Sequence, residues 1–249
     1  MEKMSNNFFS KYKIQAIDVK SKLLSRSLLW MSLGLMVIIF VAWLSSWLSS
    51  KYPAFNNFVV TFSIGSRWGL AWLFNLIIIL SLFFCIQNKN INIMIPVILY
   101  AIFAIYEGMF ITTILSFTGT TNIVKDLLLY MLIPSFVFLV MGIIAYTNLI
   151  NFSKLIPFTF FGFFAILILS LIMIFTASKT IEMLYIIIAS AMFIIWIGFD
   201  LQMIARTEDA LPNYVDKSTI NRISFMFGVK LFIDFVNLLM IVLRIFRNR

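Results

Sequence analysis

Long apolar stretches with few charges limit the fold of this chain more than any other feature. Apolar side chains make up 62% of the 249 residues, whereas charged side chains make up only 12%. A soluble domain would need more polar residues to cover its surface. A run of about 20 apolar residues is long enough to cross a bilayer as a helix. The sequence therefore predicts an all-α polytopic membrane protein.

The apolar runs predict six long spans and a shorter seventh helix. The six runs cover residues 27–48, 68–86, 93–117, 127–150, 156–177 and 182–204, and the shorter one covers 229–246. Most connections are short, so neighbouring spans should be antiparallel. Residues 49–67 are expected to form a looped extracytoplasmic connection. We expect one seven-helix domain over residues 27–249, preceded by a basic arm over residues 1–26.

The basic arm predicts a cytoplasmic N-terminus, because Lys and Arg are enriched on the cytoplasmic side of membranes. It has no short apolar core and small-residue cleavage site of the kind a signal peptide carries. Six basic residues precede the first span: Lys3, Lys11, Lys13, Lys20, Lys22 and Arg26. Tryptophans at the first connection (Trp43, Trp47, Trp68 and Trp72) are typical of an aromatic belt on the other membrane face.

The side of the C-terminus is open from the sequence. Seven full crossings would place the basic residues Arg244, Arg247 and Arg249 outside, against the positive-inside tendency. A re-entrant last helix would keep them inside, provided that protein covers its ends.

Composition excludes several kinds of function. The net charge of +9 comes mostly from residues next to apolar runs, so membrane lipid explains it better than nucleic acid. The single Cys85 excludes an internal disulfide. The absence of histidine excludes Ser-His-Asp catalysis and histidine-ligated metal. We expect no cofactor.

Two aspartates, Asp200 and Asp234, lie within apolar, helix-length segments. Such a carboxylate is costly unless it faces a bundle interior, a partner charge or water. Asp200 lies four or five residues before the predicted end of its span, roughly 7 Å below the cytoplasmic interface. A last helix that starts near Gly228 would put Asp234 at a similar depth. We therefore take the two aspartates as the default functional site.

The last helix carries a polar stripe around Asp234. Lys230, Asp234, Asn237, Ile241 and Arg244 fall within an arc of about 80°. Such a stripe suits the lining of a polar core. A local ion pair between Asp234 and Lys230 is the alternative for this acid. For Asp200 the alternative is a solvated helix end that pairs with Arg206.

Two carboxylates in contact would share one proton and titrate as a pair. When both are ionised they could bind a hard cation such as Ca²⁺ in transit. Protons and Ca²⁺ would then compete for one site. Glu107 is a third acid at membrane depth, next to Gly108, which permits close helix packing. It could line an ion path or be a buried packing group.

The segments around the two aspartates resemble the closing signature of the transmembrane Bax inhibitor motif family. They read Phe199–Ile204 and Leu231–Leu239, followed by Arg244. The resemblance implies that the short last helix is surrounded by the other six. It also implies a pH-sensitive Ca²⁺ leak gated by Asp200 and Asp234, with Asn237 and Arg244 as matching polar positions. Only Lys89 could stand in for a basic gating residue of bacterial relatives.

The sequence departs from the family pattern between Arg206 and Phe227, because this stretch is longer than family members usually have. An intramembrane aspartyl protease is a weaker interpretation, because Leu231–Ile233 replaces the Gly-x-Gly that such enzymes need. A non-catalytic regulator that binds a membrane protease through the N-terminal arm is the alternative function. Abundant Ile, Phe, Asn and Lys suit an AT-rich bacterial genome and thus a bacterial plasma membrane.

Overall fold

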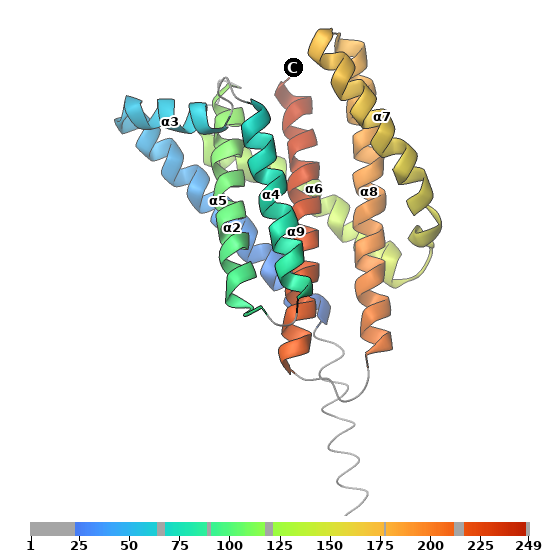
Figure 1. The fold of residues 1–249 in the computed structure, drawn as a ribbon. Coiled ribbons are helices and arrows are strands. Elements are labelled where there is room, and N and C mark those ends of the chain that lie inside the picture. The colour runs from blue at the N-terminus through green and yellow to red at the C-terminus, as the bar shows by residue number, and fades with distance from the viewer. Residues whose placement is uncertain are drawn as a thin grey trace, which may run out of the picture.

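The computed structural model describes residues 23–63, 68–88, 91–117, 122–176, 178–211 and 217–247 (Figure 1). Within these ranges all regular structure is helical. The helices are α2 (Leu23–Lys51), α3 (Pro53–Ser63), α4 (Trp68–Gln87), α5 (Met94–Phe117), α6 (Ile123–Tyr146), the 3₁₀ helix η1 (Phe152–Lys154), α7 (Ile156–Phe175), α8 (Lys179–Ala210) and α9 (Lys217–Arg247).

Six helices of the described residues are long and apolar enough to cross a membrane: α2, α5, α6, α7, α8 and α9. The predicted second span corresponds to the apolar helix α4. Large apolar side chains cover the outside of the bundle, as Phe161 at 72% exposure and Phe175 at 84% illustrate. Such a surface suits lipid, and the prediction of an all-α polytopic membrane protein is confirmed.

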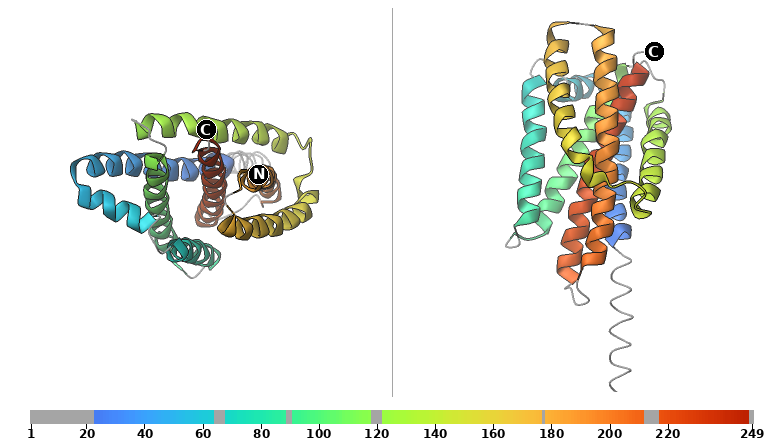
Figure 2. Two further views of the ribbon diagram at one scale, coloured as in Figure 1. Left: turned by 90° about the horizontal axis from the view of Figure 1, so that it is seen from above. Right: turned by 90° about the vertical axis from the view of Figure 1, so that its right-hand side faces the viewer.

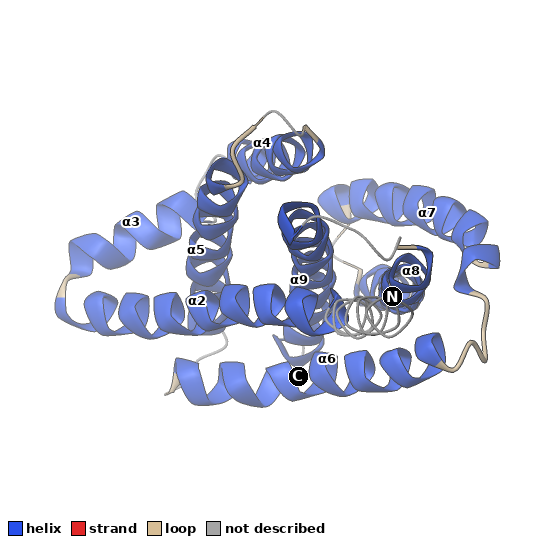
Figure 3. Cartoon of the chain, turned by 90° about the horizontal axis from the view of Figure 1, so that it is seen from below, coloured by secondary structure: helices blue, strands red, loops and turns tan. Residues whose placement is uncertain are grey.

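Helix α9 forms the centre of the bundle (Figures 2 and 3). In its most apolar stretch 72% of the residues are buried, against 6% for the peripheral α7. The expectation that α9 is short was wrong, because it has 31 residues and begins at Lys217 rather than near Gly228. In its first turns, exposed polar residues alternate with buried residues, namely Ile220, Ser224 and Phe225. A search for uniformly apolar runs misses such an amphipathic segment.

One end of the bundle, here called the N-face, collects the start of α2, the end of α8 and the start of α9. The backbone N–H of Leu24 donates to Glu208 at 3.0 Å, and Arg26 donates to Asn221 at 3.0 Å. From the N-face α9 continues as one unbroken helix to the opposite end, where the chain terminates (Figure 1). The re-entrant alternative for the last helix is therefore wrong.

Two predicted connections contain more helix than expected. The expected loop over 49–67 includes α3, which lies across the bundle at the end opposite the N-face (Figure 1). Its start at Pro53 is physically sensible, because proline is well tolerated at the first helical position. The long stretch between Arg206 and Phe227 is also mostly helical, because α8 continues to Ala210 and α9 begins at Lys217.

Two glycines allow α2 to pack closely against its neighbours. A Cβ on Gly228 of α9 would lie 2.5 Å from Cβ of Trp30 and 2.8 Å from the carbonyl oxygen of Ser27. A Cβ on Gly108 of α5 would lie 2.8 Å from Cβ of Val41. Side chains at these positions would push the helices apart, so the expected role of Gly108 in close packing is confirmed.

We predict that Gly228→Val destabilises the protein by about 1–3 kcal/mol, the usual cost of overpacking a closely packed interior. The thermal unfolding midpoint in detergent measures the loss. Gly142→Val is the matched control, because a Cβ there meets no atom within 4 Å. Equal midpoints for the two variants would contradict the close α2–α9 packing.

Candidate functional site

The structure brings Asp200 of α8 and Asp234 of α9 together inside the bundle. Their carboxyl groups are near enough for a side-chain hydrogen bond and direct electrostatic interaction. The Asp200 side chain is 13% exposed, and Asp234 is buried. Oδ2 of Asp234 has no hydrogen-bond partner within the described part of the chain. This oxygen is therefore available to a proton or a cation.

Lys230 completes a three-residue cluster with the aspartates. Its Nζ lies 3.6 Å from Oδ1 of Asp200, so this ion pair joins α9 to α8. Lys230 also interacts electrostatically with Asp234, one turn further along α9. The two alternative ion pairs considered for the aspartates were Asp234 with Lys230 and Asp200 with Arg206. In the structure Lys230 pairs with Asp200 across the interface between α9 and α8. Arg206 donates to Ser153 and Asn151.

Helix α8 continues further past Asp200 than the sequence suggested. Helix α8 continues from residue 200 to residue 210, so Asp200 lies ten residues, or about 15 Å, before its C-terminal end. The apolar run ends near residue 204, and the additional helical residues include the polar Arg206, Glu208 and Asp209. Because Asp234 is buried and the Asp200 side chain is only 13% exposed, the charges of the cluster depend on their protein neighbours to compensate for lost hydration.

The charge of the cluster depends on a single proton. With both carboxylates ionised and Lys230 charged, the three groups sum to one negative charge. One proton on the aspartate pair makes the sum zero. Two nearby carboxyls readily hold one such proton, because mutual repulsion opposes the doubly ionised form. The cluster can therefore exchange a proton or a cation without leaving a large uncompensated charge.

Asn237 and Arg244 continue the polar stripe along α9 beyond the cluster. Asn237 is half-buried, three residues after Asp234. The Arg244 guanidinium lies over the ring of Tyr185 on α8, with 4.6 Å between Cζ and the ring centroid. Its Nη1 is buried without a hydrogen-bond partner among the described residues. At ten residues from Asp234, about 15 Å, Arg244 is not part of the carboxylate cluster.

Glu107 is buried on α5 next to the close α2–α5 contact at Gly108. Glu107 interacts electrostatically with Tyr106 on the same helix, whereas the interactions described for Asp200 and Asp234 join these two residues to each other and to Lys230. Lys89, the expected basic candidate at the end of the second span, lies outside the described residues.

Arg222 makes a partly buried contact between helices that the sequence analysis missed. From the first turns of α9 it donates to the carbonyl oxygens of Ile86 at 3.3 Å, Asn88 at 2.5 Å and Ile91 at 2.5 Å. The last carbonyls of a helix lack intrahelical donors, and a guanidinium with five N–H groups can satisfy several. The sequence signal for this contact is Arg222 itself, which lies in the stretch between Arg206 and Phe227 that the apolar runs assign to a connection between helices.

Gln202, two residues after Asp200, fixes the turn between α6 and α7. Its Oε1 accepts from the backbone N–H of Phe152 at 3.1 Å, and its Nε2 donates to Asn148 and to the carbonyl of Ile150 at 3.1 Å each. The side chain is buried, so these bonds are shielded from water. They hold the segment of α8 that carries Asp200 against a fixed neighbour.

Comparison with known proteins identifies the family of this chain. Residues 20–249 match the family model described as "Inhibitor of apoptosis-promoting Bax1". An uncharacterized protein of Borreliella burgdorferi is 29% identical over 112 residues, which cover 45% of this chain and 47% of that protein. The alignment thus spans about half of that relative's length. Because the family model covers nearly the whole chain, this protein belongs to the Bax inhibitor family.

Proposed function

We propose that this chain is a pH-sensitive Ca²⁺ leak channel, gated by Asp200 and Asp234. The observation that supports the proposal is the buried carboxyl pair, in which Oδ2 of Asp234 has no hydrogen-bond partner among the residues that the structure describes. Hard cations prefer carboxylate and carbonyl oxygens, and Ca²⁺ accepts six to eight of them in flexible geometry. Two carboxylates from two helices supply part of such a shell, and water and backbone carbonyls supply the rest.

Lys230, which is attached to α9, competes with the cation for the carboxylate of Asp200. Its ammonium takes the place of a positive ion at Asp200, to which it is paired at 3.6 Å. A Ca²⁺ ion can engage both carboxylates only after Lys230 moves away. Lys230 is partly exposed, at 26%, so its ammonium has a direction in which to withdraw. In this proposal, the arrangement with Lys230 paired to Asp200 is the closed state of the channel.

Protonation acts on the same contact between α8 and α9. A proton shared by the aspartates reduces the negative charge that attracts both Lys230 and Ca²⁺. The ion pair that joins the two helices is weakened at the same time. A change in pH thereby shifts the balance between conformations that differ at this contact.

A non-catalytic role is part of the proposal. Leu231 and Phe232, shortly before Asp234, are fully buried, and the Phe232 ring packs against Tyr100 and Phe103 at centroid distances of 5.1 and 5.8 Å. An aspartyl protease must seat an extended substrate strand beside its carboxyl pair. Bulky packed rings on this side of Asp234 oppose such a strand.

We also propose a bacterial plasma membrane with the N-face in the cytoplasm. Arg26, Arg206 and Arg222 lie at or near this end of the bundle, in keeping with the positive-inside tendency. The relative from Borreliella burgdorferi supports a bacterial setting.

Neutralising either aspartate should abolish the pH dependence of Ca²⁺ flux. We expect native protein in dye-loaded liposomes to pass Ca²⁺ at a rate that varies over roughly pH 5 to 8. Asp200→Asn and Asp234→Asn should each remove this variation, and the double variant should add nothing, because one pair titrates as a unit. Asp209→Asn, at the exposed end of α8, is the matched control. Folded native protein without flux above empty liposomes would refute the channel.

Removing the Lys230 charge should make Ca²⁺ a stronger competitor for the pair. For Lys230→Met we expect a lower half-saturating Ca²⁺ concentration for flux. We also expect the pH midpoint of flux to move upward by on the order of 1 pH unit, because a nearby cation favours ionised carboxylates. Lys154→Met, at an exposed lysine of η1, is the control. If neither the pH midpoint of flux nor the half-saturating Ca²⁺ concentration changes, Lys230 does not compete with Ca²⁺ for the aspartates.

A further inference from the structure

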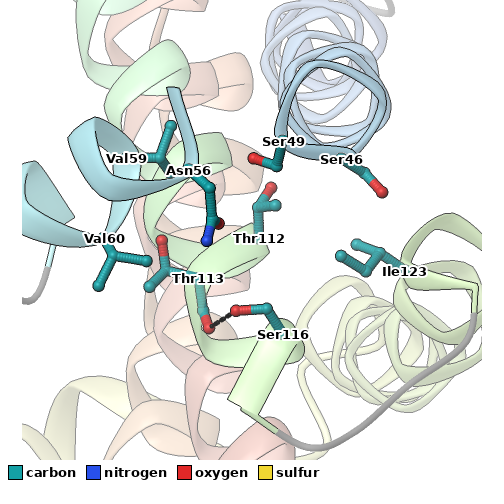
Figure 4. Close-up of a pocket in the computed structure, with 9 residues that line it drawn as sticks. All are labelled: Ser46, Ser49, Asn56, Val59, Val60, Thr112, Thr113, Ser116 and Ile123. Atoms are coloured by element: carbon teal, nitrogen blue, oxygen red, sulfur yellow. Dashed lines mark hydrogen bonds between the residues drawn. The ribbon is translucent and has the colours of Figure 1, made fainter. Parts of the chain in front are cut away.

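A small cavity with several hydroxyl-bearing residues in its wall lies at the end of the bundle opposite the N-face (Figure 4). Its volume is about 60 Å³, which is room for about four water molecules. Helices α2, α3, α5 and α6 contribute to its wall. The lining residues are Ser46, Ser49, Asn56, Val59, Val60, Thr112, Thr113, Ser116 and Ile123. Six of these nine side chains carry an oxygen, although the surrounding helices are strongly apolar.

The hydroxyl groups of α5 present lone pairs to the cavity rather than protons. Thr112 donates to the carbonyl of Gly108 at 2.7 Å, Thr113 to that of Met109 at 2.9 Å, and Ser116 to that of Thr113 at 2.7 Å. A hydroxyl has one proton and two acceptor lone pairs. Because each proton is used within the helix, these three groups can only accept from a ligand. The wall is therefore biased toward a positively charged or hydrogen-donating guest.

The helix ends at the cavity have the same preference. Ser46 and Ser49 belong to the last turns of α2, which ends at Lys51, and Ser116 belongs to the last turn of α5. Unpaired carbonyls and the helix dipole make C-terminal ends favourable for cations. The opposing N-terminus of α6 is capped by Asn122, whose side chain accepts from the N–H of Lys125 at 3.1 Å. The ammonium of Lys51 lies outside, over the Trp47 ring.

We propose that this cavity is a binding site for a partly hydrated cation, and that it is the outer vestibule of the ion path. The inference rests on the proposed channel function and adds a second site to it. Neutral oxygens bind a cation more weakly than carboxylates do, as a site of passage requires. Asn56 of α3 lines the cavity and is exposed, so the cavity reaches the surface of the protein beside α3 (Figure 4).

The floor of the vestibule is closed where α2 and α5 touch. Gly108, whose carbonyl holds the Thr112 hydroxyl, leaves no room for even a Cβ beside Val41 and the backbone of Ile38. Glu107 is the next residue along α5 and is buried at this closure. A cation in the vestibule would therefore be one and a half helical turns, about 7.5 Å, from the level of Glu107. Passage to the Asp200–Asp234 pair requires this contact to loosen.

The test separates the vestibule from the aspartate pair. The variant Thr112→Val/Thr113→Val keeps the side-chain shape but removes two acceptors. We expect its half-saturating Ca²⁺ concentration for liposome flux to rise about two- to tenfold, the effect of losing one or two ligand contacts. Thr159→Val is the matched control, because its hydroxyl also bonds its own helix, at Ile156, but lies away from the cavity. Ser49→Ala/Ser116→Ala is the second variant if the first does not fold.

A binding readout needs no flux. In the background Asp200→Asn/Asp234→Asn, Ca²⁺ should still raise the unfolding temperature of the detergent-solubilised full chain, because a ligand that binds the folded state stabilises it. The Thr112→Val/Thr113→Val change should remove this rise, and Thr159→Val should retain it. If that pattern holds but native protein passes no Ca²⁺, the vestibule stands and the channel fails. If flux is pH-dependent but neither readout responds to the threonines, the vestibule is overturned and the channel stands.

Discussion

A polar group inside a bilayer has no water to bind, so it must find a partner within the protein. Hydroxyls such as that of Thr112 donate to their own helix, whereas Gln202 and Arg222 bond to turns that are distant in the sequence. Among the described residues, Oδ2 of Asp234 and Nη1 of Arg244 are buried without a partner. Both lie on one arc of α9. An unmet polar atom is costly, and here the cost is concentrated on one face of the central helix.

Buried aromatic rings pack against α9 on its other side. Phe225 and Phe232 are fully buried and meet Tyr100 edge-on at centroid distances of 5.7 and 5.1 Å. Trp30 packs on Phe225 in the same way at 4.9 Å. Edge-to-face rings prefer definite orientations, so this side of α9 resists small displacements. The central helix therefore combines a fixed aromatic side toward α2 and α5 with a polar side toward α8.

Much of this arrangement could be predicted from the sequence, and the remainder has physical reasons. Hydropathy located the long spans, because a bilayer demands about 20 apolar residues at a time. It failed for residues 217–228, where an amphipathic turn precedes the apolar run, and for α3, which lies across the bundle. Helical periodicity placed Lys230 and Asp234 on one face. It could not show that Lys230 pairs with Asp200, because the partner of a side chain depends on the rotation of a neighbouring helix. Arg222 and the cavity beneath α3 depend on contacts between distant segments, for which one sequence carries no signal.

The contact of Arg222 has a mechanical consequence. One guanidinium joins the start of α9 to three carbonyls around the turn between α4 and α5. Eight residues further along, the same helix is joined to α8 through Lys230. A helix transmits axial rotation along its length, since its backbone hydrogen bonds make it stiff. Any rotation of α9 that releases Lys230 from Asp200 therefore also pulls on the turn between α4 and α5 through Arg222. The Lys230 contact and the Arg222 contact are mechanically coupled.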